Sequence, residues 1–122
     1  MRTARLLFLI LATLFLSPNA AFAHAGLVSA NPVANSEVTV MPEKIELTFS
    51  EDLLVIGEKS VNTLSLNLLD GAEIPLTNIE VNGAKLTATI PSGNYQSGSY
   101  ELFYSIVSAD GHKVSDSYLF SL

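Results

Sequence analysis

The sequence predicts an all-β protein, an antiparallel Greek-key β-barrel or sandwich of the immunoglobulin-like kind with about seven or eight strands. Apolar residues recur at every second position in several short runs, which is the period of a strand with one buried face rather than of a helix. Turn-forming residues separate these runs at intervals of about 8–12 residues. The chain has no cysteine, so the fold must be stabilised by a well-patterned core without disulfides.

The expected strands follow from this alternation. Short strands are expected at residues 27–30 and 37–40, and regular ones at 45–49, 64–68 and 86–90. Residues 100–107 are largely apolar on both faces, which predicts a central strand. The last strand is expected at 114–122. The stretch 52–62 shows no clear period and is predicted as a loop or irregular connection.

Turn chemistry supports these boundaries. Asp70-Gly71 and Asn82-Gly83 are dipeptides that tolerate positive φ in tight hairpins. Residues 91–94 and Ser97-Gly98 predict a longer loop before the central strand.

The first 23 residues have the pattern of a secretory signal peptide. Arg2 and Arg5 form a basic start, residues 6–16 are apolar, and Ala21-Phe22-Ala23 is a small-x-small cleavage site. The apolar run is too short for the roughly 20 residues of a membrane-spanning helix. We therefore expect cleavage after Ala23, with residues 1–23 removed and 24–122 forming one exported, soluble domain.

The charge of the remaining domain limits its partners. Residues 24–122 contain four lysines against twelve carboxylates, so the formal net charge changes from −6 for the whole chain to −8. Nucleic acids and anionic membrane surfaces favour basic proteins, so neither is an expected partner. Without a cysteine there is no lipid-modified N-terminus, and we expect no direct membrane anchor.

Two histidines indicate a metal site. Cleavage after Ala23 would make His24 the first residue, and its α-amine and imidazole Nδ1 can then close a chelate ring on one ion. The other histidine, His112, stands two residues after Asp110, so both side chains point the same way if the chain is extended there. Three nitrogens and one oxygen suit tetragonal Cu(II), although zinc accepts the same ligands tetrahedrally.

Each residue also has a purely structural interpretation. A terminal histidine is often a frayed end. Asp110 and His112 could form an Asx-type turn with a solvated imidazole.

Three motifs resemble the CopC family of periplasmic copper-binding proteins, and the resemblance covers essentially the whole of 24–122. They are HAGLVSANP from His24, IELTFSE from Ile45 to Glu51, and the segment from Tyr100 that ends in SADGH at His112. The resemblance implies a Greek-key β-barrel in the periplasm. It also implies one Cu(II) ion per mature chain, bound by the α-amine and imidazole of His24, the carboxylate of Asp110 and the imidazole of His112. Glu51 matches a family glutamate near that site and is a second-tier candidate.

The chain departs from the family pattern in three places. Lys113 stands where a proline is common, and Asp116 where a glycine is common. Some family members carry a methionine-rich loop for Cu(I), whereas Met41 is the sole methionine after the signal peptide. One thioether does not make a Cu(I) site, so we expect Cu(II) binding alone, with Met41 as a packing residue.

The function expected from these residues is binding rather than catalysis. The protein would sequester or carry Cu(II) in copper homeostasis or resistance, with an inner-membrane copper transporter of the CopD type as a candidate partner. One alternative is a small copper oxidative enzyme of the histidine-brace type, in which one of the four tyrosines supplies an axial phenol. The other is a metal-free immunoglobulin-like interaction module in which both histidines are incidental.

Overall fold

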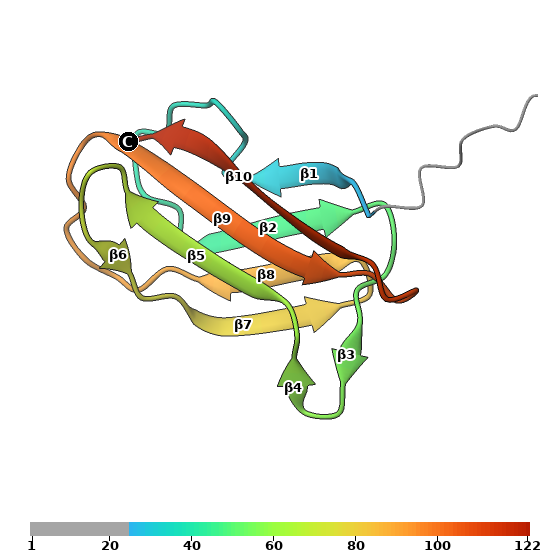
Figure 1. Ribbon diagram of the computed structural model, residues 1–122. Coiled ribbons are helices and arrows are strands. Elements are labelled where there is room, and N and C mark those ends of the chain that lie inside the picture. Colours follow the sequence, from blue (N-terminus) through green and yellow to red (C-terminus); the bar gives the residue numbers. More distant parts are fainter. Residues whose placement is uncertain (1–24) are drawn as a thin grey trace, which may run out of the picture.

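The computed structural model describes residues 25–122, and this part of the chain contains strands and no helix (Figure 1). One antiparallel sheet has the order β1-β2-β8-β7, with β1 at Leu27–Asn31, β2 at Lys44–Phe49, β8 at Lys85–Thr89 and β7 at Thr77–Asn82. The other has the order β10-β9-β5-β6, with β10 at Lys113–Ser121, β9 at Ser99–Val107, β5 at Thr63–Leu68 and β6 at Glu73–Ile74. A small hairpin, β3 (Val55–Ile56) and β4 (Lys59–Ser60), stands apart from both. The predicted all-β antiparallel fold class is confirmed.

The core lies between the two sheets, because alternate side chains of the inner strands point inward. Strand β9 shows the pattern most fully: Tyr100, Leu102, Tyr104 and Ile106 are at most 4% exposed. Two aromatic pairs pack within this core. Phe49 meets Tyr104 edge-on at a centroid distance of 5.4 Å, and Tyr100 stacks on Phe120 at 5.6 Å.

Six of the expected strands are present, namely those at 27–30, 45–49, 64–68, 86–90, 100–107 and 114–122. The expected central strand, β9, lies between β10 and β5 in its sheet. Its outer face is nevertheless open to solvent, since Phe103 is 40% exposed. The apolar residues on that second face therefore do not mark a strand buried on both sides.

The expected strand at 37–40 is wrong. Only a single parallel bridge joins Glu37 to Ser121, and Val38 N donates to Ser121 O at 2.8 Å. Pro42 follows closely and has no N–H to give to a sheet. This segment therefore covers the end of β10 and then crosses to the other sheet as an irregular connection.

Four short or polar strands do not follow from the sequence pattern. Strands β3 and β4 fall in the stretch expected to be irregular, and β6 has two residues. Strand β7 is an edge strand, mostly exposed, with a register shift between Thr77 and Glu80. An edge strand without a buried face has no apolar alternation to reveal it.

The tight turns confirm the turn chemistry. Asp70 has φ 63° in the β5–β6 connection, and Gly83 has φ 60° between β7 and β8. Both are left-handed conformations, which Asp tolerates better than most residues and glycine adopts without strain.

The long strands separate two ends of the domain (Figure 1). The β7–β8 turn, the β9–β10 connection and the residues leading into β1 lie at one end, and the last residue, Leu122, lies at the other. Strand β10 has nine residues, so the ends are about 30 Å apart. Within residues 25–122 no helix is long and apolar enough to cross a membrane.

Candidate metal centre

The β9–β10 connection folds around one buried serine. Ser108 is 0% exposed, its N–H donates to His112 O at 2.9 Å, and its carbonyl accepts from Gly111 N at 2.8 Å. Its hydroxyl donates to Asp110 Oδ1 and lies 3.2 Å from His112 O. Gly111 has φ 93°, a left-handed conformation that strains a side chain, so glycine suits this bend. Together these contacts fix the backbone of the loop that carries Asp110 and His112.

Asp110 and His112 converge, but in a turn rather than in the extended chain assumed from the sequence. The hydrogen bond from His112 N to Asp110 Oδ1 is the Asx-type turn of the structural interpretation. His112 Nδ1 lies 3.0 Å from Asp110 Oδ1, and the same oxygen accepts from His112 N at 3.2 Å. Both side chains remain open to solvent, with exposed fractions of 43% for Asp110 and 55% for His112. Their polar atoms can therefore be reached by an ion from outside.

The hydroxyl of Ser108 lowers the pKa of the Asp110 carboxylate. Its hydrogen bond is the largest cause that lowers the pKa of Asp110 to about 2, followed by the hydrogen bonds from the side chain and backbone of His112. An ionised carboxylate beside an imidazole supplies one oxygen and one nitrogen donor. Two donors that each lie about 2.0 Å from one ion, at right angles, are separated by about 2.8 Å. The observed 3.0 Å is thus compatible with two ligands of a single ion.

His24 lies outside the described residues, so its place relative to Asp110 and His112 remains a prediction. Within residues 25–122 no three His, Cys, Asp or Glu side chains form a metal-binding group. The structure thus does not bring Glu51 together with Asp110 and His112, although it puts Glu51 on the segment that leads from β2 to the hairpin.

This connecting segment, residues 50–54, touches the candidate loop through its backbone. Asp52 O accepts from Ala109 N at 2.9 Å, Leu54 N donates to Val107 O at 2.8 Å, and Leu53 forms an isolated bridge with Ser108. Leu53 is 6% exposed and belongs to the core. The loop is therefore attached to the chain that leaves β2 as well as to its own strands.

Asn62 completes this attachment from the other side of the hairpin. It is 3% exposed; its Nδ2 donates to Leu54 O at 2.8 Å, and its Oδ1 accepts from Val107 N at 2.9 Å. Sequence reasoning missed Asn62, and an asparagine in an aperiodic stretch gives no signal for such a role. The buried Ser108 is easier to find from the sequence, because it stands two residues before Asp110.

The alternative of an oxidative copper enzyme needs a tyrosine hydroxyl as an axial ligand. Three of the four tyrosine hydroxyls form hydrogen bonds within the fold instead. They donate to backbone carbonyls: Tyr95 to Pro91 O, Tyr100 to Gln96 O at 2.6 Å, and Tyr118 to Pro32 O at 2.7 Å. The fourth, Tyr104, is 4% exposed in the core, where burial raises its pKa.

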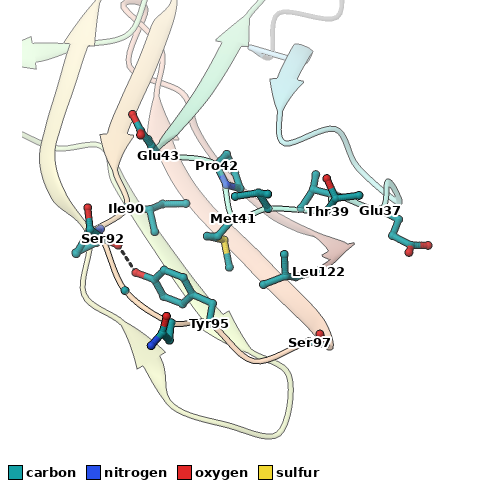
Figure 2. Close-up of a pocket in the computed structure, with 15 residues that line it drawn as sticks. Glu37, Thr39, Met41, Pro42, Glu43, Ile90, Ser92, Tyr95, Ser97 and Leu122 are labelled. Atoms are coloured by element: carbon teal, nitrogen blue, oxygen red, sulfur yellow. Dashed lines mark hydrogen bonds between the residues drawn. The ribbon is translucent and has the colours of Figure 1, made fainter.

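An open groove occupies the opposite end of the domain (Figure 2). It has a volume of about 830 Å³ and is lined by residues 37–43, 90–95, Ser97 and Leu122. Figure 2 shows the thioether of Met41 on the same side of the groove as the ring of Tyr95. Met41 is partly buried and packs against the core, which confirms its expected packing role. The groove is thus separated from Asp110 and His112 by the length of β10.

The fold and this loop define a class: a small antiparallel β-sandwich with an Asp-x-His loop at one end. The family model described as the CopC domain matches residues 27–122, and the chain belongs to the CopC family.

Three relatives show how far the similarity reaches. The chain is 30% identical over 128 residues to Protein YobA of Escherichia coli strain K12, which covers 99% of this chain and 95% of that protein. It is 33% identical over 112 residues to Copper resistance protein C of Xanthomonas campestris pv. juglandis, covering 88% and 86%. A third, Copper transport protein CutJ of Bacillus subtilis, is 30% identical over 126 residues, but the match spans 22% of its length.

Two solved structures have the same fold. CopC from Methylosinus trichosporium OB3b matches with a TM-score of 0.66 and 25% identity, over 80% of this chain and 92% of that one. PcoC, a methionine-rich copper resistance protein from Escherichia coli, matches with a TM-score of 0.66 and 28% identity, over 81% and 98%. The present chain contains two methionines in all, Met1 and Met41, so it differs from PcoC in that respect.

Proposed function

We propose that this protein binds Cu(II) and sequesters or carries it in the periplasm, after export and cleavage of the signal peptide behind Ala23. The ligands are the α-amine and imidazole of His24, the carboxylate of Asp110 and the imidazole of His112. The observation that carries the proposal is the 3.0 Å approach of His112 Nδ1 to an exposed, ionised Asp110. The names of the relatives, copper resistance and copper transport proteins, supply the identity of the metal.

The donor set supports Cu(II) over other ions. Nitrogen and oxygen ligands in a tetragonal arrangement suit Cu(II), which also has the highest affinity in the divalent series. With Met41 packed against the core, no group of thioethers is left for Cu(I). We therefore propose one Cu(II) ion per mature chain and no Cu(I) site.

Binding rather than turnover is the proposed role. Asp110 as a ligand would occupy a position that an oxidative copper enzyme leaves open to oxygen or substrate. The chain matches 22% of the length of a copper transport protein. This match supports delivery of the ion to a transport protein, and the expected partner is of the CopD type.

The test is a Cu(II) titration with electron paramagnetic resonance on two proteins, one starting at His24 and one with a single extra residue ahead of it. We expect tight one-to-one binding with nitrogen-rich tetragonal spectra for the first, and markedly weaker binding for the second, because the added residue removes the α-amine of His24 from the chelate. Equal affinity of both proteins would remove the α-amine from the site. Binding by neither would contradict the copper function itself.

A further inference from the structure

The residue that follows His24 is part of the core. Ala25 is 1% exposed and belongs to the same cluster as the inward-facing residues of β2 and β9. A buried methyl group at this position means that the described chain does not begin with a frayed turn. Its first residue is already packed in the core.

Gly26 is held by a reciprocal pair of hydrogen bonds. Its N–H donates to Ser50 Oγ at 2.9 Å, and its carbonyl accepts from Ser50 N at 2.8 Å. Ser50 directly follows β2, and the regular pairing of β1 with β2 is interrupted between Leu27 and Ser29. The Ser50 contacts thus hold the chain at Gly26, on the N-terminal side of this irregularity.

Ser50 also begins the segment that touches the Asp110–His112 loop. Two residues further on, Asp52 O accepts from Ala109 N at 2.9 Å, and Leu54 N donates to Val107 O at 2.8 Å. One short stretch of chain, residues 50–54, is therefore bonded at its start to the residue two positions after His24. At its end it is bonded to the loop that carries the other candidate ligands.

We propose that Ser50 is a positioning residue for metal binding: its hydroxyl fixes the start of the domain relative to Asp110 and His112. This inference rests on the proposed function, because Ser50 can have this role only if the terminal chelate of His24 binds the same ion as Asp110 and His112. A ligand set that is ordered before the ion arrives loses less conformational entropy on binding, and it therefore binds the ion more tightly. Ser50 itself donates no electron pair to the metal.

The expected effect follows from the loss of one hydrogen bond. Ser50→Ala removes the Oγ acceptor of Gly26 N–H and leaves the backbone bond from Ser50 N to Gly26 O in place. A net hydrogen bond of ordinary strength corresponds to a roughly 3–10-fold change in an equilibrium constant. We expect Cu(II) affinity to fall by about this factor, with an unchanged ligand set.

The test uses the chain starting at His24 in four forms: the parent, Ser50→Ala, Ser50→Thr and Ser36→Ala. Threonine keeps the hydroxyl and should restore binding. Ser36→Ala is the matched control, because Ser36 Oγ also makes a single hydrogen bond to the backbone, 2.6 Å to Val33 O, in a segment that pairs with the C-terminal end of β10. Three quantities are measured: the Cu(II) dissociation constant by competition, the paramagnetic resonance spectrum, and amide hydrogen exchange of Gly26 in the metal-free protein.

Weaker Cu(II) binding and faster Gly26 exchange in Ser50→Ala alone, with the parent spectrum retained, would support the proposal. Parent-like affinity in Ser50→Ala, while the parent binds tightly, would overturn the role of Ser50 and leave the copper function standing. A changed spectrum in Ser50→Ala would also overturn it, since Ser50 would then affect which atoms bind. Absence of binding in the parent would contradict the proposed function and this inference with it.

Discussion

The backbone carbonyl of Asp52 accepts a 2.9 Å hydrogen bond from the amide of Ala109. This bond joins the chain that leaves the β1-β2-β8-β7 sheet to the loop between β9 and β10 of the other sheet. Two further backbone contacts, between Leu54 and Val107 and between Leu53 and Ser108, continue the junction. The loop with Asp110 and His112 is thereby held by both sheets, as a site that binds an ion through fixed donors requires.

Replacement of His112 should weaken Cu(II) binding more than replacement of Asp110. His112→Ala removes a nitrogen donor, and a loss of at least about 100-fold is expected, since removing a group that merely orients a ligand already costs about 10–100-fold. Asp110→Asn keeps the shape but loses the charge, and we expect a loss of about 10–100-fold. Competition titration measures both values.

Glu73→Gln is the control for the lost negative charge, because Glu73 is exposed on β6, outside the loop. A loss in Glu73→Gln as large as in Asp110→Asn would mean that overall charge, rather than ligation, sets the affinity. A parent-like affinity in His112→Ala would remove this residue from the site.

Cu(II) affinity should fall steadily as pH drops from about 8, the pKa range of an α-amine, because protons compete for the amine and both imidazoles. Asp110 does not contribute to this fall, since its pKa of about 2 keeps it ionised over the whole range. Dissociation constants measured between pH 8 and 5 check the prediction. An affinity that is constant over this range would contradict the amine and imidazole ligand set.

The sequence predicts the sandwich well where one face of a strand is buried. In β2 the exposed Lys44 is followed by Ile45, Leu47 and Phe49, all at most 3% exposed, so period and burial agree. Where a strand lies at an edge, as β7 does, the pattern disappears, because solvent on most sides removes the need for apolar residues. Phe103 shows the converse error, in which an apolar residue on the outer face of β9 suggests burial that the fold does not provide.

The candidate site is predicted only in part, for a physical reason. The spacing of Asp110 and His112 predicts that they approach each other, but the reason is different: residues two apart share a side in an extended chain, whereas here the chain turns at Gly111 and Asp110 Oδ1 accepts from His112 N. The supporting contacts of Asp52, Leu54 and Ala109 are made by backbone atoms that every residue has, so no residue type reveals them.

The metal-free protein should lose stability in acid through Asp110. Its pKa is lowered from 3.8 to about 2 in the folded state, first by the hydroxyl of Ser108. A lowered folded pKa gives stability that is present above the unfolded value and is lost as pH falls through the folded value. We therefore expect the denaturant concentration at the midpoint of unfolding to decrease as the pH is lowered from about 4 to 2 in the parent. In Asp110→Asn this decrease should be smaller.

Ser108→Ala provides a second variant for this prediction. It removes the largest cause of the lowered pKa, so Asp110 should titrate closer to 3.8 in this protein, as followed by the carboxyl chemical shift. An Asp110 titration that is the same with and without the Ser108 hydroxyl would contradict this account of the loop.

Asn62 should be the costliest polar residue to remove near the site. Asn62→Ala leaves the amide of Val107 and the carbonyl of Leu54 without their side-chain partner in a buried position. A buried polar group that loses its partner costs about 1–3 kcal/mol, so we expect the free energy of unfolding to fall by about 2–4 kcal/mol. Urea denaturation measures it, with Asn94→Ala in the exposed loop before β9 as the matched control, expected within about 0.5 kcal/mol of the parent. Equal stability of both variants would show that water replaces the Asn62 contacts, and that the hairpin base does not secure the loop of Asp110 and His112.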